Sequence, residues 1–227
     1  KRIEYQHYID RNRMTKNYKS LIILILFALQ VVSSWAQKPF VFHNKKFRIA
    51  QFTDLHWDAK SPKCDSTRTT ILNILQREKP DIAILTGDVV TEKPYEKGWK
   101  QIIEIFETAR TPFVVTMGNH DAEHFSRDEI YRMLFASKFY SGLPSPKEIS
   151  GNGNCALPIY DNNTANAKPK AVLYCIDSND YQPDKDLGEY DWIHFDQIEW
   201  YRRSSEAFTL QNNKRPLPSL MFFHIPL

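Results

Sequence analysis

The sequence contains little cysteine, little glycine and no apolar run long enough to cross a membrane. Only three of its 227 residues are Cys and only seven are Gly, which excludes a disulfide-rich scaffold and a collagen-like chain. The composition is otherwise that of a globular protein, with 42% hydrophobic and 13% aromatic residues, enough to build a core. The length fits one large domain or two small ones.

The chain also lacks an excess of one charge outside its first segment. The formal net charge is +3, but residues 1–20 carry six Lys or Arg against Glu4 and Asp10, so the remainder has a formal charge of −1. A body near neutrality has no electrostatic footprint for nucleic acid, and we therefore predict no nucleic-acid binding.

An apolar run, Leu21–Val32, follows a short basic segment that begins at Met14. The run is shorter than the roughly 20 residues of a membrane span. Ser34 and Ala36 supply small residues at the −3 and −1 positions of a cleavage site, so we predict a secretory signal peptide rather than an uncleaved anchor or a buried helix. The predicted organisation is upstream read-through over 1–13, the signal peptide over 14–36 and one domain over 37–227. The protein is then exported, either periplasmic or secreted.

The cysteines Cys64, Cys155 and Cys175 show neither the even number of a disulfide framework nor a zinc-binding spacing. We expect the three cysteines to be small, partly buried side chains of the fold. It leaves open whether one disulfide forms in an exported protein, and between which two cysteines.

Short apolar runs alternate with amphipathic segments along the domain. The runs are rich in Ile, Val, Leu and Phe with little alternation, which is typical of strands buried on both faces. We predict strands at Phe47–Thr53, Asp81–Thr86, Pro112–Met117, Ala171–Ile176 and Leu220–Ile225. We predict helices at Thr67–Lys79, Gly98–Arg110, Arg127–Lys138 and about Asp196–Phe208, the third beginning with a capping box formed by Ser126 and Glu129.

This order of elements predicts an α/β fold with right-handed crossovers and a parallel sheet. Two stretches, Ser141–Lys170 and Tyr181–Asp191, are rich in Pro, Gly or polar residues and are predicted as loops. We expect Asp177 to cap a loop, and Trp192 and Trp200 to pack against the fold.

Polar side chains follow the predicted strands at the points where the strands end. In an open α/β sheet, ligands bind beyond the carboxyl ends of the strands. The residues concerned should therefore meet at one edge: Asp54, His56, Asp88, Asn119, His120, Asp121 and His224. Carboxylate, imidazole and amide oxygen together suit Zn, Mn or Fe.

The spacing within these strand ends suggests individual roles. Asp54 and His56 leave one strand end a residue apart and could bind one metal ion. Asp88 follows a glycine that permits a tight turn, and its two oxygens could bridge two ions. Asn119 offers a neutral oxygen, which leaves His120 free for proton chemistry. Asp121 could accept the ring N–H of His120 and hold that ring in place.

Four elements of this sequence, in this order, resemble the motifs of the calcineurin-like metallophosphoesterase superfamily. They are Asp54-x-His56, Gly87-Asp88, Gly118-Asn-His-Asp121 and His224. Further stretches resemble the subgroup of plant "probable inactive purple acid phosphatases" and related fungal phosphatases. These stretches are Gln51–His56, Gly151–Asn154 with Leu157 and Pro158, Tyr190–Trp192 with Gln197 and Trp200, and Phe222–Leu227. The resemblance covers about 47–227 and implies an α/β/β/α sandwich.

The resemblance implies a phosphoester hydrolase with two divalent or trivalent metal ions and a small phosphorylated substrate. Asp54 and His56 would hold the first metal ion, Asp88 would bridge, and Asn119 and His224 would hold the second. A metal-bound hydroxide would attack phosphorus, while His120 would stabilise the transition state or protonate the leaving oxygen. The tyrosine ligand of purple acid phosphatases has no counterpart, because position 57 is Trp.

Three functions remain open at this stage. The first is an exported phosphomonoesterase, and the second is a phosphodiesterase acting on nucleotides or lipid head groups. The third is an inactive module that binds phosphate or a partner, because the family's final Gly-His-x-His element does not follow His224 in this sequence. We expect this sequence to be a C-terminally truncated fragment of a longer protein.

Overall fold

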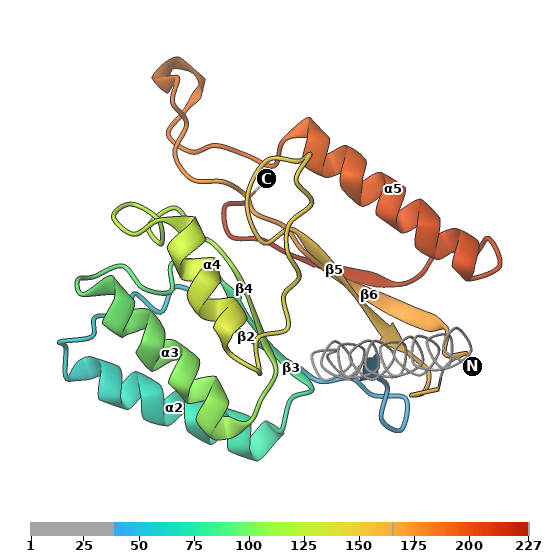
Figure 1. The fold of residues 1–227 in the computed structure, drawn as a ribbon, viewed down its shortest axis with the longest axis horizontal. Coiled ribbons are helices and arrows are strands. Elements are labelled where there is room, and N and C mark those ends of the chain that lie inside the picture. The colour runs from blue at the N-terminus through green and yellow to red at the C-terminus, as the bar shows by residue number, and fades with distance from the viewer. Residues whose placement is uncertain (1–38, 165, 227) are drawn as a thin grey trace, which may run out of the picture. The chain divides into compact units, whose positions relative to one another are not determined.

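The computed structural model describes residues 39–164 and 166–226, so the predicted read-through and leader lie outside the described residues. No helix within the described part is long and apolar enough to cross a membrane. The elements follow in the order β1 Phe40–Val41, β2 Ile49–Phe52, α2 Lys63–Glu78, β3 Ile82–Thr86, α3 Tyr95–Ala109, β4 Phe113–Thr116, α4 Arg127–Ala136, β5 Cys155–Tyr160, β6 Pro169–Cys175, the 3-10 helix η1 Lys185–Leu187, α5 Phe195–Gln211 and β7 Ser219–Phe222 (Figure 1).

The first sheet confirms the predicted parallel strands. Its order is β2-β3-β4, and both pairs are parallel, with Ala83 opposite Ala50 on one side and opposite Phe113 on the other. Strand β3 is buried along its whole length, as expected for an apolar strand with a neighbour on each side. Helices α2 and α3 form the crossovers that parallel strands require.

The second sheet contains two strands that were not predicted, β1 and β5. Its order is β1-β5-β6-β7, and β5 runs antiparallel to β6. Residues 141–170 were predicted as loops throughout, and this is wrong for β5, whose side chains alternate between buried and half-buried. The strand contains Pro158 and follows a stretch rich in Gly, Pro and Asn residues, so its period of two is hard to recognise.

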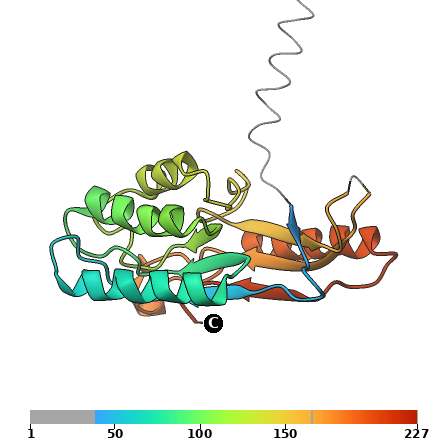
Figure 2. The ribbon, with the colours of Figure 1, turned by 90° about the horizontal axis from the view of Figure 1, so that it is seen from below.

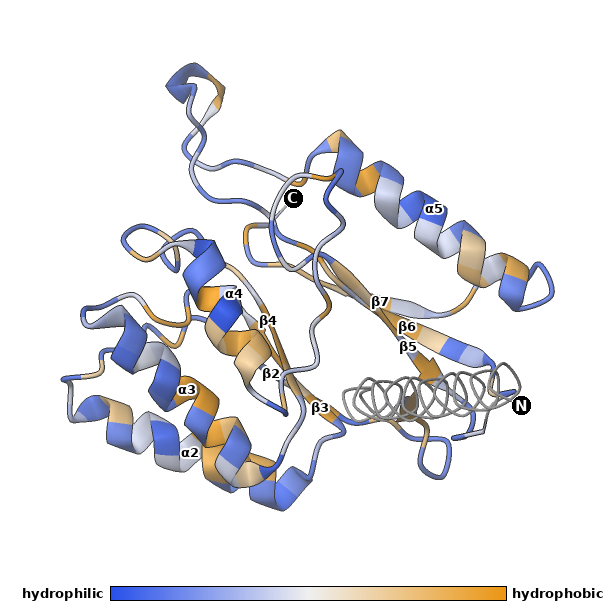
Figure 3. Cartoon of the chain, in the orientation of Figure 1, coloured by the Kyte–Doolittle hydropathy of each residue, from blue (hydrophilic) through white to orange (hydrophobic). Residues whose placement is uncertain are grey.

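The two sheets pack face to face and helices cover both outer faces, which gives the expected α/β/β/α sandwich. Side chains of β3 and β4 meet those of β5, β6 and β7 between the sheets. Helices α2, α3 and α4 cover the first sheet, with Trp99 and Phe106 fully buried, and α5 covers the second. Figure 2 shows α5 on the far side from the other helices, and Figure 3 shows hydrophobic residues along the strands and along part of α3.

The helix termini show how local sequence sets some of the boundaries. The predicted capping box at the start of α4 is present, since the Ser126 hydroxyl accepts from the Glu129 N–H and the Glu129 carboxylate accepts from the Ser126 N–H. Helices α2 and α3 end at Lys79 and Arg110, whose backbones are left-handed.

Of the two tryptophans predicted to pack, Trp200 contacts Tyr174 of β6, but Trp192 is 44% exposed.

Candidate metal centre

The loops that leave β2 and β3 run side by side and are held by their own backbones. The Asp54 N–H donates to the Gly87 carbonyl at 3.1 Å, and the His56 N–H donates to the Asp88 carbonyl at 3.0 Å. Asp54, His56 and Asp88 all have positive φ, of 51°, 41° and 50°. Non-glycine residues adopt this left-handed conformation at an energetic cost, and such strain clusters at functional sites.

Two glycines keep the centre open because a side chain at either position would collide with a polar group of the site. A Cβ atom at Gly87 would lie 2.4 Å from the ring of His224, and φ at this glycine is +83°. A Cβ atom at Gly118 would lie 2.2 Å from Asp88 Oδ1. Close approach of the strand ends therefore requires glycine at both positions.

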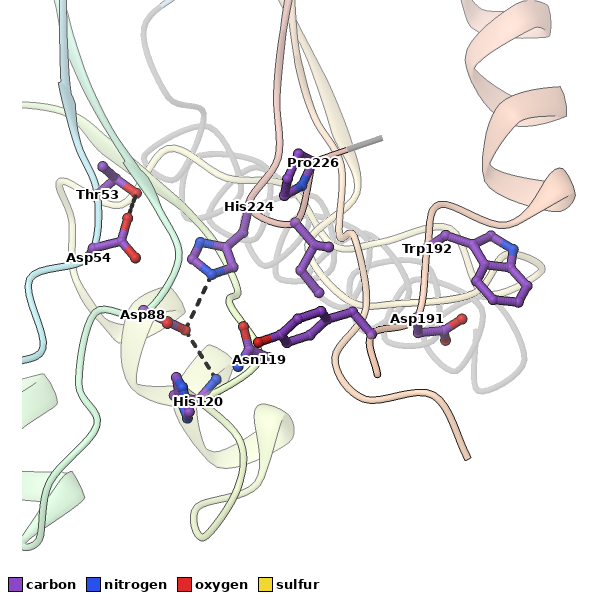
Figure 4. Close-up of a pocket in the computed structure, with 11 residues that line it drawn as sticks. Thr53, Asp54, Asp88, Asn119, His120, Asp191, Trp192, His224 and Pro226 are labelled. Atoms are coloured by element: carbon purple, nitrogen blue, oxygen red, sulfur yellow. Dashed lines mark hydrogen bonds and ion pairs between the residues drawn. The ribbon is translucent and has the colours of Figure 1, made fainter. Parts of the chain in front are cut away.

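Three of the predicted ligands converge from the ends of three strands. One ligand atom each from Asp54, Asp88 and His224 lie within 4.8 Å of one another. His56 is adjacent, with its Nε2 3.8 Å from Asp88 Oδ2 and 4.0 Å from Asp54 Oδ1. In Figure 4, Asp88 lies between the ring of His224 and His120, whose backbone N–H donates to Asp88 Oδ1 at 3.1 Å.

The orientation of His224 is fixed by its backbone partner. Its Nδ1 lies 2.8 Å from the Thr86 carbonyl, so Nδ1–H donates there and Nε2 faces Asp88 at 3.5 Å. The hydrogen bond to Asp88 outweighs burial and raises the pKa of His224 to about 9. Burial alone would raise the pKa of Asp88, but hydrogen bonds from His224 and His120 bring it below its ordinary value.

Asn119 and His120 line the same pocket as the ligand group. The pocket has a volume of about 690 Å³. Its wall includes Asp54, Asp88, Asn119, His120, Tyr190, Asp191, Trp192, His224, Ile225 and Pro226. The rings of His56 and His120 lie 6.0 Å apart. The structure thus places six of the seven predicted residues in or beside one cavity.

Asp121 does not hold the ring of His120, and this prediction is wrong. The Asp121 carboxylate is buried and accepts the backbone N–H groups of Val89 and Val90 at 2.7 and 3.0 Å on one oxygen and that of Gly118 at 2.9 Å on the other. Burial raises the pKa of Asp121 to about 6, against these three hydrogen bonds. Its side chain therefore fastens the β3 and β4 loops together.

Two residues that the sequence analysis missed take the place expected for Asp121. Glu123 Oε1 lies 2.9 Å from His120 Nδ1, and the Tyr181 hydroxyl donates to the same oxygen at 2.8 Å. The hydrogen bond from Tyr181 helps to lower the pKa of Glu123, whereas burial raises the pKa of Tyr181. Glu123 stands only three residues after His120, a spacing that could have indicated it, but Tyr181 gave no signal within its polar loop.

The donor set of the centre fits a first-row transition metal. Two carboxylates, two imidazoles and the neighbouring amide oxygen of Asn119 suit Zn, Mn or Fe, and none of these ligands is a thiolate. Both oxygens of Asp88 face an imidazole, since His56 approaches its Oδ2 and His224 its Oδ1. The arrangement can hold cations next to His120, whose Nδ1 is paired with Glu123.

Residues 47–227 match the Calcineurin-like phosphoesterase family. Among curated proteins, the chain is 29% identical to "Probable inactive purple acid phosphatase 29" of Arabidopsis thaliana, over 81% of this chain and 55% of that protein. It is 28% identical to "Phosphatase DCR2" of Saccharomyces cerevisiae, over 86% of this chain and 37% of that protein. The chain thus spans about half or less of the length of the curated relatives it matches.

A dimetal phosphatase from Danio rerio has a similar fold, with a TM-score of 0.55 at 13% identity over 79% of this chain and 70% of that one. The family match covers most of the domain, including every strand end that contributes to the centre. The chain belongs to the calcineurin-like phosphoesterase family.

Proposed function

We propose that this domain binds two metal ions and hydrolyses phosphate monoesters. The observation that carries the proposal is the convergence of Asp54, Asp88 and His224 from three separate strands beside His120. Two carboxylates on strained backbone meet an imidazole here, and this combination of ligands suits a cation. The family supports phosphoester hydrolysis in general, and the monoester preference is our hypothesis.

In this proposal Asp54 and His56 hold one metal ion, Asn119 and His224 hold the other, and Asp88 contacts both. When bound, the ions supply positive charge that neutralises the phosphoryl oxygens and makes water more acidic. His224 presents Nε2 to the centre because its Nδ1–H is taken by the Thr86 carbonyl.

His120 is the proton donor for the leaving oxygen. Its Nδ1 is paired with Glu123, which leaves Nε2 available to the pocket. A carboxylate behind the ring stabilises the protonated form and fixes the ring orientation.

Metal analysis and two matched substrates test this function. We expect about two equivalents of Mn, Fe or Zn in the purified protein, and faster hydrolysis of nitrophenyl phosphate than of bis-nitrophenyl phosphate. Faster cleavage of the diester would instead favour a phosphodiesterase. His120→Ala should lower kcat roughly a hundredfold or more while metal content stays unchanged, in line with the usual contribution of a general acid.

An inactive phosphate-binding module is the second candidate, because three of the matched plant relatives carry the word "inactive" in their names. In that case the protein binds metal and inorganic phosphate but does not turn over either substrate. Absence of hydrolysis with every metal tested, together with phosphate binding by calorimetry, would select this function.

We further propose that the protein is exported, on the strength of the leader-like pattern at 14–36. N-terminal sequencing of the mature protein should begin at Gln37. A mature protein that retains the leader would contradict export by this route. The absence of nucleic-acid binding also stays a prediction.

A further inference from the structure

Tyr181 reaches the centre from a segment that belongs to neither ligand loop. It lies six residues after the end of β6, where its backbone bridges to Tyr190 across a short two-stranded turn. The Gln182 N–H donates to the Glu189 carbonyl and the Asp191 N–H to the Asp180 carbonyl, both at 3.1 Å. The turn thus holds the tyrosine at a fixed place in the chain.

The Tyr181 hydroxyl meets three groups that belong to the centre. It accepts from the Asn119 amide at 3.0 Å, donates to Glu123 Oε1 at 2.8 Å and lies 3.3 Å from His120 Nδ1. Within the described part of the chain, no other side-chain hydroxyl is recorded in hydrogen bonds with both Asn119 and Glu123. The hydroxyl oxygen of Tyr181 therefore links Asn119, a candidate metal ligand, to Glu123, the hydrogen-bond partner of His120.

The directions of these bonds determine how both partners are turned. An amide that donates its N–H to Tyr181 must direct its oxygen elsewhere, which leaves Asn119 Oδ1 for a cation. The carboxylate of Glu123 accepts both the tyrosine O–H and the His120 Nδ1–H, so its position is fixed from two sides. Without the hydroxyl, both the amide and the carboxylate gain freedom to rotate.

The ring of Tyr181 is held independently of its hydroxyl. It stacks on Tyr190 at 5.9 Å between centroids with an interplanar angle of 24°, and the Lys185 ammonium lies 5.8 Å from the ring centroid. Removal of the oxygen alone should therefore leave the segment in place. This separation makes the hydroxyl testable.

We propose that Tyr181 is a positioning residue that sets the amide of Asn119 for metal binding and, through Glu123, the ring of His120 for proton transfer. The proposal rests on the metal centre and adds a residue outside the strand ends to it. Partners of metal ligands of this kind typically affect metal affinity or activity by about 10- to 100-fold.

Calorimetric titration with Mn²⁺ tests the first half without reference to activity. In Tyr181→Phe we expect one of two binding events to weaken about tenfold or more, while the other is unchanged. Tyr160→Phe, at the opposite end of β5 from the centre, is the matched control and should bind as the unaltered protein does. Identical Mn²⁺ affinities in all three proteins would overturn the role toward Asn119.

Kinetics with saturating metal test the second half by a double-mutant cycle. Tyr181→Phe and Glu123→Gln should each lower kcat for nitrophenyl phosphate about tenfold with less than a twofold change in KM. The double variant should be little worse than either single variant, because both act on one network. Independent, multiplying effects, or an unchanged kcat in Tyr181→Phe, would overturn the role toward His120.

The two measurements separate this proposal from the proposed function. A protein that binds Mn²⁺ but hydrolyses nothing contradicts the phosphatase and leaves the titration to decide the role of Tyr181. A protein that hydrolyses the monoester with Tyr181→Phe equal to the unaltered protein in both assays contradicts only the positioning role.

Discussion

The two sides of the centre are built in different ways. On the ligand side, the loops after β2 and β3 are joined by backbone hydrogen bonds and contain residues with positive φ. The buried Asp121 carboxylate joins the loop after β4 to them, and two glycines stand where there is no room for a side chain. On the other side, the backbone of residues 177–192 pairs within its own turn, and side chains attach this segment to the rest of the domain, since Arg127 pairs with Asp177 and Asp180. The short loops at the strand ends place the ligands through their backbone conformation. The longer segment needs hydrogen bonds and ion pairs from individual side chains to keep its position.

The difference teaches where the molecule should be sensitive. Substitutions that add a side chain between the ligand loops should weaken metal binding. The backbone of these loops has no room to accommodate the added atoms without a shift of the ligands. Changes that remove a partner of the 177–192 segment should act on stability or on orientation, since its position depends on individual contacts. Four substitutions, each with a matched comparison, test this contrast, beginning with the largest expected effect on stability.

The largest effect is expected for Arg127→Met at the base of the 177–192 segment. The Asp177 side chain is fully buried and forms its ion pair with Arg127, so the variant leaves a buried carboxylate without its countercharge. Loss of one partner of such a pair costs about 3–5 kcal/mol in free energy of unfolding, measurable by urea denaturation. Arg203→Met, on the exposed face of α5, is the control and should change stability by less than about 0.5 kcal/mol.

The loss in Arg127→Met should grow with pH. Burial already raises the pKa of Asp177, and Arg127 counteracts it. Without the guanidinium the pKa in the folded state rises further above the unfolded value. Stability is then retained below the unfolded pKa and lost as pH increases through the folded pKa, so the variant should be weaker at pH 8 than at pH 5. A small loss, independent of pH, would show that the segment does not depend on this pair.

Gly118→Ala should act on the ligand side. Its Cβ atom would lie 2.2 Å from Asp88 Oδ1 and 2.4 Å from the Asp88 backbone nitrogen, so that the β3 loop must shift. We expect about 1–3 kcal/mol of destabilisation, the usual cost of overpacking, and at least a tenfold loss of Mn²⁺ affinity by calorimetry. Gly188→Ala introduces backbone strain in open space and should leave the affinity unchanged. Equal metal affinities in both variants would refute geometric control of the ligands.

Asp121→Asn and Glu123→Gln should separate the two acidic residues near His120. An amide at position 121 replaces one acceptor oxygen with a donor that faces backbone N–H groups, which costs about 1–3 kcal/mol. Glu123 is partly exposed, so Glu123→Gln should alter stability by less than about 0.5 kcal/mol. Thermal unfolding of both variants at pH 8 checks the difference. The reverse order of stabilities would contradict the structural role of Asp121 between the two loops.

Much of the fold follows from patterns within single segments. All five apolar runs correspond to strands and all four amphipathic segments to helices, with boundaries that differ by up to four residues. Strand β5 and the short β1 were missed because neither carries a long apolar run. The pairing of strands into two sheets came from the family resemblance, since periodicity within a strand does not identify its neighbours.

For the centre, the sequence by itself determined which residue types stand at the strand ends. Because parallel strands present their carboxyl ends at one edge of a sheet, these residues could be predicted to lie close together. Only the tertiary structure decided the support of His120. Asp121 is adjacent in sequence, but the turn directs its carboxylate into the backbone of two loops, and Glu123 and Tyr181 reach the ring instead. Side-chain direction in a turn depends on φ, ψ and contacts made across 60 residues of chain, and no local pattern encodes them.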